Sequence, residues 1–78
     1  MSVFEEISHS VQSGAARAVK ELVEKAIAEG SSAKDILEKG LMPAMEIIGE
    51  KFKNNDIFVP EVLVASRAMN VGAAVLKP

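Results

Sequence analysis

The sequence predicts an all-α protein, an antiparallel four-helix bundle with a kinked third helix. Apolar residues recur at helical spacing along most of the chain, and no segment shows the sustained alternation of a half-buried strand. Glycine or proline stands where each helix should stop or bend. The connections between the four segments are short, which favours antiparallel neighbours. With 78 residues, the chain is expected to form one domain, residues 1–78.

The first two helices have clear start and stop signals. Ser2 and Glu5 have the spacing of a capping box, which predicts a helix over residues 3–12 that ends at Gly14. The second helix should end at Gly30. Its apolar stripe is the most regular of the chain and consists of Ala15, Ala16, Ala18, Val19, Leu22, Val23, Ala26 and Ile27.

The third helix is expected in two parts. Ser32 should cap a short helix over residues 33–39, and Gly40 and Pro43 should then cause a kink or a brief break before a longer segment to about residue 53. Gly49 in that segment predicts close approach of a neighbouring backbone, because glycine otherwise weakens a helix. The methionines Met42, Met45 and Met69 lie on apolar faces and are predicted to fill the core.

The fourth helix is expected from Pro60 to Leu76, with Pro60 in its first position. Its apolar residues spread over more than half of its circumference, which exceeds what one side of a four-helix bundle buries. The helix is therefore either central or docks on something outside this chain. At Lys77-Pro78 we expect a linker to another domain to begin.

The corner between the last two helices is unusually apolar. Asn54-Asn55-Asp56 is typical of a turn, because these short side chains bond the local backbone. Four large apolar residues surround it: Phe52, Ile57, Phe58 and Val59. Such a surplus at one end of a bundle predicts a docking surface for a flat apolar partner or ligand.

Composition excludes several classes of function. The net charge of -2 comes from interspersed charges and gives no basic surface for nucleic acid. The N-terminus lacks the features of a secretory signal, and no apolar stretch approaches the ~20 residues that cross a bilayer, so no membrane partner is expected. The chain has no cysteine, which excludes disulfides and thiolate metal sites. We expect a cytoplasmic protein.

Neither catalysis nor metal binding is expected of this chain alone. Glu6 and His9 have the Glu-x-x-His spacing of di-iron bundles, but such a site needs the pair twice, and His9 is the only histidine. A metal site would require a symmetric dimer, and a solvent-facing histidine is the simpler interpretation. Glu46 and Glu50 lie one turn apart and are interpreted as a solvated surface. No phosphate-binding glycine motif is present.

The stretch from Gly40 to Phe52, together with Ile57-Phe58-Val59-Pro60-Glu61-Val62 and Ala65-Ser66-Arg67-Ala68-Met69, resembles a known domain. It is similar to the helical cap domain that precedes the Rossmann-like cobalamin-binding domain of corrinoid methyl-carrier proteins and cobalamin-dependent methionine synthase. The resemblance covers nearly the whole chain. The G-x-x-F motif, the polar turn and the F-V-P-E motif are its most specific part.

The resemblance implies a function in a cobalamin-dependent methyltransferase system. In the family, the cap covers the methyl-bearing upper face of the corrin and moves aside for methyl transfer. The positions that contact cobalamin correspond to Phe52, Val59 and Val62. The implied partners are the Rossmann-like domain of the same protein and a substrate-specific methyltransferase.

The resemblance also shows what to expect of an isolated cap. The family's cobalt-coordinating motif is Asp-x-His-x-x-Gly in the following domain, whereas His9 is preceded at that spacing by Ile7 and followed by Gln12. We therefore expect the chain to be the cap alone and to bind cobalamin weakly or not at all. Its start at Met1 favours the small methyl-carrier proteins over methionine synthase.

A second hypothesis is a helical module that self-associates through the last helix and the apolar corner, without a cofactor. Under either hypothesis we expect the isolated chain to form homodimers, because both leave apolar surface uncovered. An Asp-x-His-x-x-Gly sequence within ~30–50 further residues would decide for the cap.

Overall fold

The computed structural model describes residues 2–77, and all of its regular structure is helical. Its elements are α1 (Val3–Gln12), α2 (Ala16–Ala28), α3 (Ala33–Ile36), the π-helical segment η1 (Leu37–Leu41), α4 (Met42–Lys53) and α5 (Val59–Leu76). No strand occurs among these residues. Because α3, η1 and α4 follow one another without a gap, residues 2–77 form four helical segments, and the prediction of an all-α fold is confirmed.

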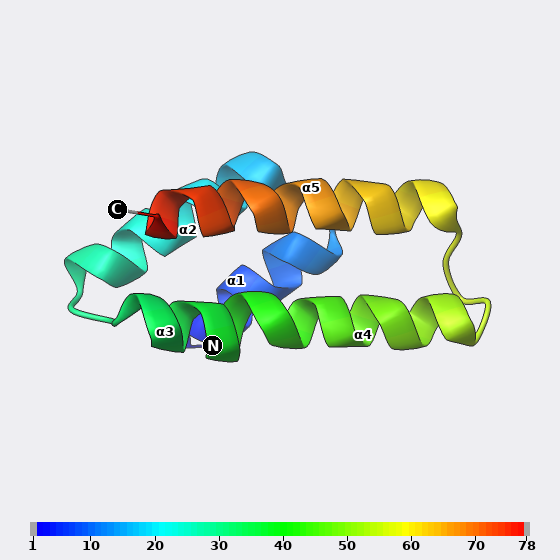
Figure 1. The fold of residues 1–78 in the computed structure, drawn as a ribbon, viewed down its shortest axis with the longest axis horizontal. Helices are drawn as coiled ribbons and strands as arrows, with labels where there is room; N and C mark the ends of the chain where they lie inside the picture. Colours follow the sequence, from blue (N-terminus) through cyan, green and yellow to red (C-terminus); the bar gives the residue numbers. More distant parts are fainter. Residues whose placement is uncertain (1, 78) are drawn as a thin grey trace.

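Two long helical segments define the shape of the molecule, which measures 38 × 19 × 18 Å. The rod of α3, η1 and α4 follows the long axis, and α5 returns alongside it (Figure 1). The short helix α1 packs against α2, η1 and α4, while α2 packs mainly on α5. The turn from α4 to α5 lies at one end of the long axis, beyond α1 and α2 (Figure 1).

Helix starts follow the local signals in the sequence. Ser2 and Glu5 form the expected capping box, in which the Glu5 amide donates to Ser2 Oγ at 3.2 Å. At the start of α3, the Asp35 amide donates to Ser32 Oγ at 3.1 Å. Gly14 and Gly30, which follow α1 and α2, have φ of 74° and 96°, the left-handed conformation that glycine adopts without strain.

The third helical segment has no break at Gly40 and Pro43. Leu41 and Met42 keep right-handed helical angles, and the Met42 amide donates to the Leu37 carbonyl, five residues back. The expected interruption is therefore a π turn, which accommodates one extra residue within a continuous helix. Close packing against α1 accompanies this turn. Gly40 is buried, and Ile7 Cγ2 lies 3.1 Å from the position that a Cβ at Gly40 would take. Only glycine therefore fits at position 40 without a shift of Ile7.

The core lies between α1, α2, η1 and the neighbouring parts of α4 and α5. It consists of Ile7, Val11, Val19, Val23, Ala26, Ile36, Leu41, Ala44 and Ala68. Gly72 on α5 is also buried, and a Cβ there would lie 2.7 Å from Val19 Cγ1. Met45 and Met69 pack partly buried against this core, as predicted. The prediction was wrong for Met42, whose side chain is exposed.

Helix α5 extends further than the core needs. It ends at Leu76, as expected, and the predicted linker start at Pro78 lies outside the described residues. Over its 18 residues the mean hydropathy is 1.3, and 17% of them are buried. It is thus long and apolar enough to cross a bilayer, so the expectation that no stretch approaches this length was wrong. The core helices of soluble proteins also reach this length and composition.

Candidate functional site

The turn between α4 and α5 is held by backbone hydrogen bonds. The Asn54 amide donates to the Glu50 carbonyl at 3.0 Å, and the Asp56 amide donates to the Lys51 carbonyl at 2.8 Å. Asn55 adopts φ of 63°, a left-handed conformation that asparagine tolerates better than most residues. The polar turn predicted from the sequence is thus confirmed. It directs the chain sharply back into α5.

Helix α5 begins one residue earlier than expected. Phe58 occupies the N-cap position with an extended backbone, and Val59 is the first helical residue, so Pro60 is in the second position. No side chain accepts a hydrogen bond at this helix start, in contrast to the starts of α1 and α3. An aromatic residue at an N-cap exposes apolar surface where a short polar side chain is usual.

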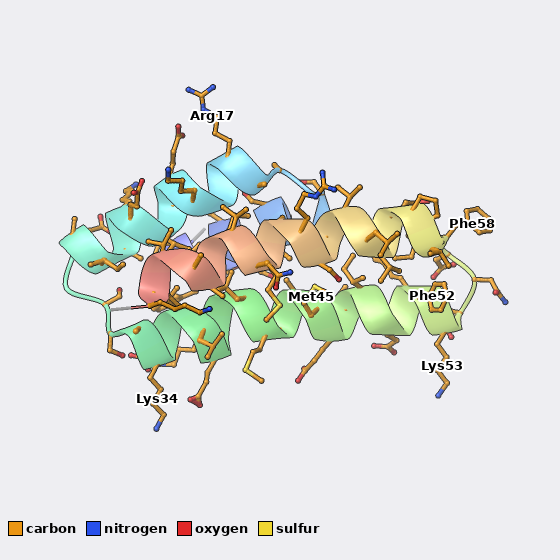
Figure 2. All side chains as sticks on the ribbon, turned by 45° about the horizontal axis from the view of Figure 1, so that its top comes forward. Arg17, Lys34, Met45, Phe52, Lys53 and Phe58 are labelled. Carbon is orange, nitrogen blue, oxygen red and sulfur yellow. The ribbon has the colours of Figure 1, made fainter. Side chains whose placement is uncertain are left out.

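Four large apolar side chains are exposed around this turn, and we call them the apolar corner: Phe52, Phe58, Val59 and Leu63. Their exposed fractions are 45%, 69%, 54% and 63%. Figure 2 shows Phe52 on the last turn of α4 and Phe58 at the same end of the molecule. Single exposed apolar residues are normal on a protein surface, but a group of large ones at one end marks a site of interaction.

The structure places the three residues predicted to contact a cofactor at this end of the molecule. Phe52 and Val59 belong to the apolar corner, and Val62, on the next turn of α5, is half-buried. Leu63 was missed by sequence reasoning and Phe58 was not assigned to the site, although both are more exposed than the predicted residues. A signal for Leu63 was available, because it follows Val59 by four residues and therefore lies on the same side of α5.

The apolar corner offers van der Waals contacts and no means of coordinating a metal. Within residues 2–77 there is no group of three or more His, Cys, Asp or Glu side chains that could hold a metal ion. His9 is exposed on α1, as expected, and Glu46 and Glu50 are exposed on α4. The site can therefore shield an apolar surface from water, and its side chains supply no group for acid–base or nucleophilic chemistry.

Among residues 2–77, two clefts are lined by residues outside the apolar corner. One, of about 360 Å³, lies between the α1–α2 turn and the first turns of α5 and is lined by Gln12, Ser13, Gly14, Pro60, Glu61 and Val64. The other, of about 310 Å³, lies at the far end of the α3–α4 rod between Leu37 and Leu76. Neither cleft is lined by a residue of the apolar corner. The corner is therefore an open surface and not part of either cleft.

The fold and the apolar corner define a class of protein: a small helical module with large apolar side chains exposed at one end. Comparison with known protein families shows which family of helical modules the chain belongs to. The chain belongs to the B12 binding domain family, which matches residues 3–77. The sequence-based assignment to the helical domain of corrinoid proteins is thereby confirmed.

Individual relatives agree with the family. A corrinoid protein of Desulfitobacterium hafniense is 33% identical over 78 residues, which are all of this chain and 36% of that protein. Trimethylamine corrinoid protein 1 of Methanosarcina acetivorans is 41% identical over 58 residues, 74% of this chain and 27% of the relative.

A solved structure extends the agreement to three dimensions. The monomethylamine corrinoid protein of Methanosarcina barkeri matches with a TM-score of 0.92 and 32% identity, over 95% of this chain and 35% of that one. The chain thus spans about a third of the length of the relatives that it matches.

Proposed function

We propose that this chain is the cap module of a corrinoid protein in a cobalamin-dependent methyltransferase system. Its apolar corner covers the methyl-bearing upper face of the corrin and moves aside for methyl transfer. The observation that carries this proposal is the exposure of Phe52, Phe58, Val59 and Leu63 at one end of a domain of the B12 binding family. Cofactor contact is assigned to Phe52 and Val59, with Val62 beside them.

The chemistry of these residues suits a protective role. When bound, the corrinoid supplies a cobalt centre that carries the methyl group. Apolar side chains over that centre exclude water and competing reactants. Because they make no directional hydrogen bonds to the ring, the corner can be lifted without leaving polar groups unpaired, and gating of this kind is common at sequestered reaction centres.

The proposal assigns catalysis and tight cofactor binding to other parts of the system. The four side chains of the apolar corner cannot coordinate cobalt, and residues 2–77 contain no group of three or more metal-ligating side chains, so a Rossmann-like domain in the same protein is proposed to hold the cobalamin. The lengths of the relatives support such an arrangement, because this chain matches only about a third of each. The names of the matched monomethylamine and trimethylamine corrinoid proteins support a methylamine methyltransferase as the external partner.

A chimera with a relative tests the proposal. Residues 3–77 replace the matching region of the Methanosarcina barkeri monomethylamine corrinoid protein, and the product is loaded with methylcobalamin. Phe52→Ala in this chimera should increase the rate of photolysis of the cobalt–methyl bond about tenfold, which corresponds to about 1.4 kcal/mol of lost contact. Ile27→Ala on α2, an exposed apolar residue away from the corner, is the control and should leave the rate unchanged. Equal rates for both variants and the parent would contradict the shielding role.

The same exposed surface favours a second candidate, self-association without a cofactor. Leu63 and Phe58 are exposed enough to pack against a second copy of the chain. Sedimentation equilibrium of the 78-residue chain, with Leu63→Ser for comparison, measures this directly. A dimer that Leu63→Ser disrupts, combined with a chimera whose photolysis is insensitive to Phe52, would favour self-association over the cap.

A further inference from the structure

The five glycines of the chain differ in what surrounds them. Gly14 and Gly30 have positive φ, so the backbone requires them. Gly40 and Gly72 lie against the side chains of Ile7 and Val19, so packing requires them. Gly49 has neither reason: it lies within α4, it is exposed, and no described atom outside its chain neighbours and its own helical backbone lies within 4 Å of the position of a Cβ.

Gly49 is therefore unfavourable for this chain considered alone. Glycine in the interior of a helix is less stable than alanine, because it loses more conformational freedom on folding. The sequence-based expectation that a neighbouring backbone approaches Gly49 was wrong for the described residues, since the space beside it is open. A role for the missing side chain is therefore sought in contact with something outside these residues.

The position of Gly49 shows where such a partner would lie. Met45, Gly49 and Phe52 are spaced i, i+4 and i+7 and thus share one side of α4. Met45 is half-buried and Phe52 belongs to the apolar corner. Figure 2 shows Met45 between α4 and α5 and Phe52 on the last turn of α4. Gly49 lies between these two residues, so its open backbone continues the apolar corner along α4.

We propose that Gly49 is a positioning residue, at which the flat face of the corrinoid lies directly against the backbone of α4. This inference rests on the proposed function. The occupant is the corrinoid ring because the chain belongs to the B12 binding domain family and because Met45 and Phe52, which adjoin Gly49 on one side of α4, are apolar. A side chain at position 49 would hold α4 away from the ring and lift Phe52 from it. Glycine thus determines how closely the cap closes.

The test compares two substitutions on the same helix. Gly49→Leu and Glu50→Leu are made in the methylcobalamin-loaded chimera described above. Both place a leucine on the last turns of α4 at exposed positions, but position 50 is rotated by about 100° from position 49. Gly49→Leu should increase the rate of photolysis about tenfold, because the closed cap becomes less populated. Glu50→Leu should remain near the parent rate.

Gly49→Ala separates positioning from stability. In the 78-residue chain, this change should raise Tm by about 4 °C, because alanine favours the helix. In the chimera, it should increase photolysis about threefold, since the added methyl still separates the helix from the ring. Damage to the fold cannot produce both results, because an unfolded cap would not have a higher Tm.

The outcomes distinguish this inference from the function on which it rests. If Phe52→Ala accelerates photolysis while Gly49→Leu behaves like Glu50→Leu, the role of Gly49 is overturned and the shielding function stands. If neither Phe52→Ala nor Gly49→Leu has an effect, both proposals are overturned. If Gly49→Ala leaves photolysis at the parent rate, contact with the α4 backbone is overturned.

Discussion

Gly40 and Gly49 belong to the same helical rod, yet their surroundings are opposite. Gly40 is buried under Ile7, while the space beside Gly49 is open. Around Gly40, the helices α1, α2, η1 and α5 fit closely, and we call this the packed half. Toward Gly49 the part of the chain that the structure describes has no third helix over the ends of α4 and α5, and large apolar residues are exposed. One half of the domain is thus packed for its own stability, and the other exposes the apolar surface to which we assign the proposed contact with the corrinoid.

The largest expected effect tests this difference directly. Ile36 is fully buried in the packed half, and Ile36→Ala should lower the free energy of unfolding by about 3 kcal/mol through lost burial and a residual cavity. Leu63→Ala removes a similar aliphatic group from the apolar corner and should cost less than about 0.5 kcal/mol in the 78-residue chain. Urea denaturation measures both. Similar losses at the two positions would remove the distinction between the halves.

The same substitution at two helical glycines gives the next effect. Gly72→Val should cost about 2 kcal/mol, because its Cβ would lie 2.7 Å from Val19 Cγ1 and 3.0 Å from Leu41 Cδ2. Gly49→Val meets open space and should change stability by less than about 0.5 kcal/mol. Thermal unfolding by circular dichroism compares the two variants. A loss at Gly49 as large as that at Gly72 would mean that the α4 surface is packed in solution.

A smaller effect concerns how the helices begin. Ser32→Ala removes the acceptor of the Asp35 amide at the start of α3 and should cost about 1 kcal/mol. Ser10→Ala, within α1, serves as the control and should be neutral or slightly stabilising, since alanine is the better helix former. Equal effects in a urea titration would show that the cap of α3 contributes nothing.

The smallest effect should be a gain. Phe58→Ser places a serine at the uncapped N-cap of α5, three residues before Glu61, which creates the spacing of a capping box. We expect a gain of about 0.5 kcal/mol in the 78-residue chain. In the methylcobalamin chimera, the same change should increase photolysis, because the apolar corner loses its most exposed side chain. A variant that is more stable and still shields the methyl group would show that Phe58 contributes neither to the stability of the domain nor to shielding.

Local signals in the sequence predicted most of the helix boundaries correctly. The Ser2–Glu5 capping box, the Ser32 cap and the stops at Gly14 and Gly30 depend on residues close in sequence, so they can be read without knowledge of the fold. The apolar surplus around Phe52 was also visible, because it needed only a comparison of residue type with the expected polarity of a turn.

Other features depend on contacts between distant residues and could not be predicted in this way. The π turn at Leu37–Leu41 brings Gly40 against Ile7 of another helix, and a local rule for Gly40 and Pro43 predicts only an interruption. The exposure of Met42 has the same origin, since an apolar side chain is buried only if a neighbour covers it. The open space beside Gly49 depends on where the other helices lie, so residues close to it in sequence do not reveal it.

The π turn has a consequence for the direction in which the far end of α4 faces. Ile36, Gly40, Ala44, Ile48 and Phe52 follow one another at intervals of four residues, and all but Phe52 are buried. In a regular α-helix such a row winds about 160° around the axis from its first to its last member. The wider i→i+5 turn at residues 37–41 reduces the rotation per residue and so reduces this drift. One extra residue in the first half of the rod thus turns the surface that packs on the core and the surface that carries Phe52 closer to the same side of the rod.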